Sequence, residues 1–205
     1  TRLYSHLLSS SRKLLEEWLA VAGEILPVVT MCGSDPRVGR SEARHQAISK
    51  QYGLPPGNFP MLTDLVSERV QAYFGKRNKP ITVESLSSII GNVQYLLKLI
   101  ILSFTGMRDN EGSSLPYNCL RTVVADGKKH YVIEGTTTKF NNGLEKKARW
   151  VTNQQGADAI VAAQAIACSI YKVFGIDPSA ADDEPLFVSV RYLRMAGTPL
   201  VPDGA

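Results

Sequence analysis

The sequence contains little cysteine and little histidine, and the few that it has are scattered. Among 205 residues there are three of each. Cys32, Cys119 and Cys168 form no Cys-x-x-Cys pair, and no histidine stands beside them. This spacing argues against a disulfide framework and a zinc site, and it predicts reduced thiols in a cytoplasmic protein.

Long apolar runs and low-complexity tracts are also missing. The longest apolar stretch, residues 86–104, is interrupted by Asn92, Gln94 and Lys98. No uncharged run reaches the ~20 residues that span a bilayer, so we expect no membrane segment. With 44% apolar and 20% charged residues, the chain should fold rather than stay disordered, and its length allows one or two domains.

Positive charge is concentrated in one segment. Residues 121–150 carry seven lysines and arginines and three acidic residues, which accounts for the whole formal net charge of +4. A face that binds a polyanion would concentrate charge in this way. A solvent-exposed hairpin rich in lysine would have the same composition.

The first 79 residues are predicted to form a helical segment. Apolar residues recur at helical spacing in residues 7–22 and 62–74, and a shorter helix is expected near residues 41–52. Prolines and glycines, beginning with Pro27, predict loops between these helices. Residues 75–80 are polar and basic and end in proline, which suits a linker, so we expect a second domain over residues 80–205.

The second domain is predicted to combine helices with a small sheet. Residues 86–104 show the strongest helical periodicity, with Thr82 as a plausible N-cap. Strands are expected at residues 120–125, 130–138 and 147–152, with turns at residues 126–127 and 141–143 between them. An alanine-rich helix over residues 154–174 should follow. The fold class is therefore mainly α with a three-stranded antiparallel sheet (α+β).

Residues 105–115 read Thr-Gly-Met-Arg-Asp-Asn-Glu-Gly-Ser-Ser-Leu. The pattern sets Arg108 at the start of a predicted helix, where a planar, permanently charged guanidinium would suit a phosphodiester. Glu111, one turn later, would fix its direction by pairing with Arg108 or with a nearby backbone group. An ordinary surface ion pair between the two residues is the alternative interpretation.

This segment resembles the first arginine box of tyrosine recombinases, the family of the phage integrases. In that family an apolar helix runs into Thr-Gly-Leu-Arg, followed by an acidic residue and a leucine at the positions of Glu111 and Leu115. The resemblance covers roughly residues 80–187. It implies a partial catalytic domain for site-specific DNA recombination or integration by a mobile element, through a 3′-phosphotyrosine intermediate and without a metal or other cofactor.

The resemblance also assigns roles within the basic segment. Lys139 precedes the Asn-Asn-Gly turn, where the family carries the lysine that protonates the leaving 5′-oxygen, although Lys146 or Lys147 could be the counterpart. Double-stranded DNA is the expected partner, with self-association of the complete protein on DNA. The predicted DNA-binding residues are Lys128, Lys129, Lys146, Lys147 and Arg149.

Two parts of the family's active site have no counterpart in the sequence. A His-x-x-Arg box and the nucleophilic tyrosine should follow the hairpin, but His6, His45 and His130 all precede Lys139. We expect both parts beyond Ala205, so these 205 residues alone should be inactive. The alternatives are a DNA-binding relative on the same scaffold that does not cut, and a type IB topoisomerase.

Overall fold

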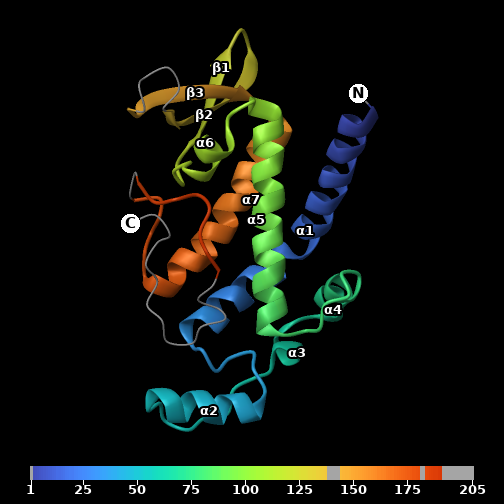
Figure 1. The fold of residues 1–205 in the computed structure, drawn as a ribbon, viewed down its shortest axis with the longest axis vertical. Coiled ribbons are helices and arrows are strands. Elements are labelled where there is room, and N and C mark those ends of the chain that lie inside the picture. Colours follow the sequence, from blue (N-terminus) through green and yellow to red (C-terminus); the bar gives the residue numbers. More distant parts are fainter. Residues whose placement is uncertain (1, 138–143, 181–182, 191–205) are drawn as a thin grey trace. The chain divides into compact units, whose positions relative to one another are not determined.

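The computed structural model describes residues 2–137, 144–180 and 183–190. The protein is mainly helical (56%) and has one three-stranded antiparallel sheet, as predicted from the sequence (Figure 1). The chain packs as two compact units. One comprises the described residues within Thr1–Leu15, Gln94–Cys168 and Asp177–Phe187, and the other those within Glu16–Val93, Ser169–Ile176 and Val188–Ala205. The domain boundary expected at residue 79 stays a prediction.

Helix α1 (Arg2–Ser34) is longer than expected because it continues through Pro27. The loop predicted at this proline was therefore wrong. A proline inside a helix removes one backbone hydrogen bond and crowds the preceding turn. Here the apolar stripe continues past it, since Ile25, Val28 and Val29 are all buried, and their burial offsets the lost hydrogen bond.

The next three helices are short. Helix α2 (Glu42–Tyr52) confirms the helix expected near residues 41–52, and Gly53 ends it in the left-handed conformation. The single helix predicted over residues 62–74 is wrong, because α3 (Leu62–Leu65) and α4 (Glu68–Gly75) are separate. Val66 is extended between them, and the Ser67 side chain accepts from the Val70 N–H to begin α4.

The stretch predicted as a linker is held by side-chain contacts within its own unit. The Arg77 guanidinium lies 3.6 Å from the centroid of the Tyr73 ring and 3.1 Å from a carboxylate oxygen of Glu17. Burial raises the pKa of the Tyr73 hydroxyl above its usual value. This segment therefore packs as part of the helical structure around it.

Helix α5 (Val83–Thr105) is the long amphipathic helix that the sequence predicts, and it leads directly to the candidate site. Thr82 caps it as expected, since its hydroxyl accepts from the Ser85 N–H at 3.2 Å. The helix ends where Gly106 takes a φ of +66°, a value that glycine adopts without strain. Helix α6 (Asp109–Ser113) follows α5 after three intervening residues and is only five residues long.

The sheet has the order β1-β2-β3, from β1 (Leu120–Ala125), β2 (Lys128–Thr137) and β3 (Lys146–Thr152). Asp126 and Gly127 both have positive φ and form the first hairpin turn, as predicted. The expected Asn-Asn-Gly turn at residues 141–143 lies outside the described residues. Figure 1 shows α6 beside the sheet, at the C-terminal end of α5.

Helix α7 (Gln154–Tyr171) continues into a 3-10 turn (Lys172–Phe174) that Gly175 closes. The segments Val83–Thr105 and Gln154–Phe174 are long and apolar enough to cross a membrane. However, 56% of each apolar window is buried inside the protein. Core helices have the same composition, so this is weak evidence for a membrane span.

Two left-handed glycines allow a matched test of the packing around α1. A Cβ at Gly39 would lie 2.9 Å from Cys32 Sγ and 3.0 Å from Val83 Cγ2, whereas nothing lies within 4 Å of one at Gly53. Each Gly→Ala change should cost about 1–2 kcal/mol for the backbone. Gly39→Ala should cost roughly 1–3 kcal/mol more from overpacking. Equal losses in urea unfolding would contradict the tight packing at Gly39.

Candidate functional site

The loop between α5 and α6 places Arg108 at the protein surface. Met107 is buried and anchors the loop, whereas Arg108 is exposed. The backbone of Arg108 is extended (φ −77°, ψ 159°), and α6 begins at the next residue. The guanidinium forms no ion pair with any residue that the structure describes.

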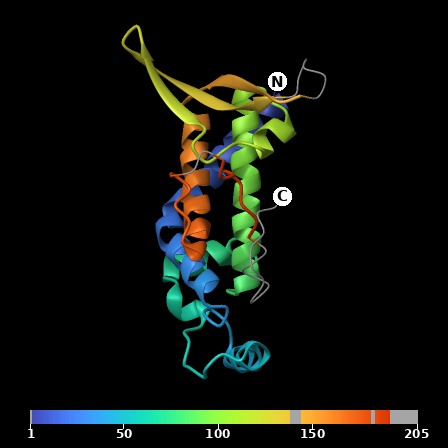
Figure 2. The same ribbon diagram turned by 90° about the vertical axis from the view of Figure 1, so that its left-hand side faces the viewer.

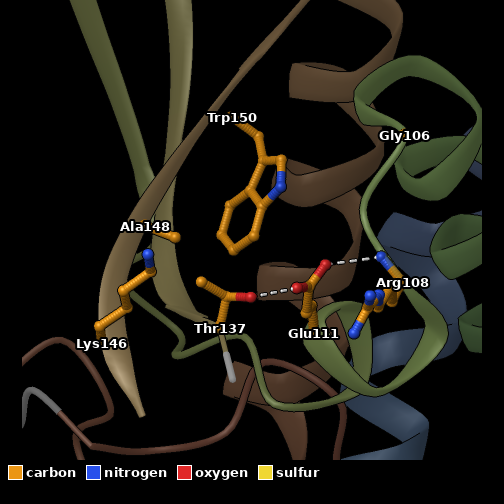
Figure 3. Close-up of a pocket in the computed structure, with 7 residues that line it drawn as sticks. All are labelled: Gly106, Arg108, Glu111, Thr137, Lys146, Ala148 and Trp150. Atoms are coloured by element: carbon orange, nitrogen blue, oxygen red, sulfur yellow. Dashed lines mark hydrogen bonds between the residues drawn. The ribbon is translucent and has the colours of Figure 1, made fainter. Parts of the chain in front are cut away.

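A buried carboxylate fixes this loop to the sheet. Glu111 is 7% exposed, and its Oε2 accepts a hydrogen bond from the Arg108 backbone N–H at 2.7 Å. Its Oε1 accepts from the Thr137 hydroxyl at the end of β2 (Figure 3). The sequence allowed Glu111 to pair either with the Arg108 guanidinium or with a backbone group. In the structure it accepts from a backbone N–H, and the guanidinium stays available for a ligand.

The loop, α6 and the sheet enclose a pocket of about 190 Å³ (Figure 3). It has two cationic side chains, Arg108 and Lys146, which reach it from different elements. The indole of Trp150 forms part of the wall. The complete lining is Gly106, Arg108, Glu111, Thr137, Lys146, Ala148 and Trp150.

Side chains alternate between the two faces of β3, and this alternation determines which of its basic residues reach the pocket. Lys146 pairs with Thr137 across the ladder, and directly paired residues share a face of the sheet. Lys147 and Arg149 are offset by one residue from Lys146 and Ala148, so they lie on the opposite face. The predicted DNA-binding residues of β3 are thus divided between two faces.

The remaining basic residues of the sheet lie away from the pocket. Arg149 and Arg121 both pair with Glu134, at 2.8 Å and 3.2 Å. Lys128 and Lys129 are exposed at the tip of the β1–β2 hairpin, which projects beyond β3 in Figure 2. The structure therefore brings together Arg108, Glu111 and Lys146 but not the other predicted DNA-binding residues. Lys139, the predicted general acid, lies outside the described residues.

Several residues that line or shape the pocket were not predicted from the sequence. Thr137 and Trp150 lie on the same face of the sheet as Lys146. Alternation of side chains along the strands would have predicted this if the register of β2 and β3 had been known. Gly135 lies on the same face, where a Cβ would be 3.1 Å from Leu115 Cδ2 and 3.3 Å from Trp150 Cζ3. Glycine at this position therefore gives the Trp150 ring its space.

Cys32 and Cys119 are buried, and no metal cluster is found within the described residues. Burial raises the pKa of Cys119 to about 12 and that of Cys32 to about 11, which makes both thiols poor nucleophiles. No group of three or more His, Cys, Asp or Glu among the described residues could hold a metal ion. The charged side chains that line the pocket are Arg108, Lys146 and Glu111.

Comparisons with protein-family models, with curated proteins and with solved structures find no significant match to this chain.

The Glu111 contacts give a prediction that a double-mutant cycle can test. Thr137→Val keeps the shape of the side chain but removes a hydrogen bond to a buried carboxylate, so unfolding should become easier by about 1.5–3 kcal/mol. Glu111→Gln should cost less, because its amide can still accept from Arg108 N–H and donate to the Thr137 hydroxyl. Thr137→Ser retains the donor and serves as the control. For the cycle itself Glu111→Ala replaces Glu111→Gln, because it removes the interaction, and strictly additive losses of Glu111→Ala and Thr137→Val in urea unfolding would rule out a direct Glu111–Thr137 interaction.

Proposed function

We propose that this chain is part of a DNA-breaking and rejoining enzyme of the tyrosine recombinase type. The observation that carries the proposal is the state of Arg108, an exposed guanidinium without an ion pair among the described residues. Its backbone is fixed by a buried carboxylate, and it shares a pocket with Lys146. Two cations at one small pocket suit a phosphodiester. The arginine-box pattern of residues 105–115 independently favours the same ligand.

In the proposed reaction a tyrosine hydroxyl attacks the scissile phosphorus and transfers its proton to a general base. A bond forms between phosphorus and the tyrosine oxygen as the bond to the 5′-oxygen breaks, and a lysine protonates the departing 5′-oxygen. Arg108 donates to the non-bridging oxygens, where charge builds up in the transition state. Religation reverses these steps without a metal or nucleotide cofactor, because the phosphotyrosine ester retains the energy of the broken bond.

Two parts of the proposed active site, a His-x-x-Arg box and the nucleophilic tyrosine, are not identified among these 205 residues. The proposed reaction needs both, and sequencing the complete gene would show whether they are encoded. Their presence would support a recombinase, and their absence would favour a DNA-binding relative that does not cut. Relaxation of supercoiled DNA without a specific site would instead identify a type IB topoisomerase.

Lys146 and Lys147 provide a matched test of DNA binding, since they are adjacent but lie on opposite faces of β3. Lys146→Ala should weaken binding to a duplex and lower the slope of log Kd against log salt by about 0.9, the value for one lost phosphate contact. Lys147→Ala should leave the slope nearly unchanged. Fluorescence anisotropy at several salt concentrations measures both. A larger effect from Lys147→Ala would mean that DNA binds the other face of the sheet.

A substrate with sulfur in place of the bridging 5′-oxygen identifies the general acid in the complete enzyme. Lys139→Ala should slow cleavage of ordinary DNA by about 10²–10⁴-fold but cleave the sulfur substrate at nearly the normal rate, because a thiolate leaves without a proton. Arg108→Ala should lose about 10²-fold or more on both substrates.

The same experiment separates the lysines. Rescue of Lys146→Ala instead of Lys139→Ala would assign the proton to the pocket lysine. Lys147→Ala is the third variant, and if sulfur rescues none of the three, the hairpin only positions the DNA and the assignment of Lys139 as general acid is wrong.

A further inference from the structure

Arg108 has two acidic neighbours in sequence, Asp109 and Glu111, yet its guanidinium pairs with neither among the described interactions. Close arginine–aspartate pairs form readily in this chain. Arg37 binds Asp35 through two nitrogens, at 2.7 Å and 2.9 Å, although only one residue separates them. The separation of Arg108 from its neighbours therefore needs a structural cause.

Each neighbouring carboxylate is engaged elsewhere. Glu111 binds the Arg108 N–H and the Thr137 hydroxyl, as described above. Asp109 binds Lys98 of α5, with Nζ 2.9 Å from Oδ1. The Lys98 ammonium also donates to the Ser113 hydroxyl at 3.2 Å, so it contacts both ends of α6. Its side chain is only 18% exposed, which limits the alternative positions it can take.

We infer that Lys98 is a positioning residue that keeps the Arg108 guanidinium available for phosphate by holding the Asp109 carboxylate away from it. The effect on phosphate binding rests on the proposed function, whereas the contacts between Lys98 and Asp109 do not depend on it. Arg108 has an extended backbone, and adjacent side chains along such a backbone start on opposite sides, so a contact between its guanidinium and Asp109 requires the two side chains to turn toward each other. Without Lys98, Asp109 would be an unpaired anion one residue from Arg108.

The loss of Lys98 would then affect binding through Arg108. The Asp109 side chain is 74% exposed and could turn toward the guanidinium once it is released. A phosphate would have to displace this carboxylate, an intramolecular competitor at high effective concentration. Lys98 would thus increase phosphate affinity without touching the phosphate.

The intramolecular part of the inference is tested on this chain without DNA. In Lys98→Met, NMR of 15N-labelled arginine should show slower hydrogen exchange at the Arg108 Nε–H than in the unmodified chain, because Asp109 now accepts from it. Lys98→Met/Asp109→Asn should restore fast exchange, and Lys98→Arg should leave it fast. Unchanged exchange in Lys98→Met would overturn the inference.

The consequence is tested by affinity for duplex DNA. Lys98→Met should raise Kd roughly tenfold, the effect of one lost charge-assisted contact, and Lys98→Met/Asp109→Asn should return it to near the starting value. In an Arg108→Ala background, Lys98→Met should have almost no further effect. Lys50→Met, on α2, removes the same charge and controls for net charge.

These outcomes separate the inference from the proposed function. If the single effects of Lys98→Met and Asp109→Asn simply add, or Lys98→Met weakens binding equally in the Arg108→Ala background, Lys98 acts through its own charge and the inference is wrong. If the chain binds DNA but Arg108→Ala changes nothing, the proposed function fails. In that case the inference about Lys98 and Asp109 is tested only by hydrogen exchange at the Arg108 Nε–H.

Discussion

The two hydrogen bonds to the Glu111 carboxylate determine the geometry of the candidate site. One comes from the loop after α5 and the other from the end of β2, so a single side chain joins two segments separated by more than twenty residues. A buried carboxylate without partners is very unfavourable, and the fold must bring both donors to it. The position of Arg108, and with it the shape of the pocket, follows from that requirement.

The sheet contributes through its register. Because side chains alternate along β3, a slip of one residue would replace Lys146 by Lys147 in the pocket and turn Trp150 to the opposite face. In the observed register Trp150 packs beside Gly135, where an added Cβ would lie 3.3 Å from its ring. The basic residues of the sheet therefore lie on two opposite faces. Lys146 belongs to the pocket, and Arg121 and Arg149 share Glu134 on the other face.

Local periodicity predicted much of the fold, because the signals of α5 and of the β1–β2 hairpin lie within each segment. It failed at Pro27 and at Val66, where burial in the core decides whether a helix continues. The same limit applies to the site. Arg108 and Glu111 stand out in the sequence, whereas Thr137 takes part through a contact with Glu111, 26 residues away, and Lys98 through contacts with Asp109 and Ser113 on another helix. For the same reason the sequence alone does not decide whether Glu111 pairs with the Arg108 guanidinium or with a backbone group.

The choice of that partner matters for the electrostatics of the site. A Glu111 carboxylate paired with the Arg108 guanidinium would orient it, but it would also neutralise most of its attraction for a phosphate. Binding the Arg108 backbone N–H instead fixes the start of the side chain while its charge stays exposed. The spacing of Arg108 and Glu111 is the same for a surface ion pair and for an anion site. What distinguishes the two is whether other donors, here the Thr137 hydroxyl and the Arg108 amide, already occupy the carboxylate.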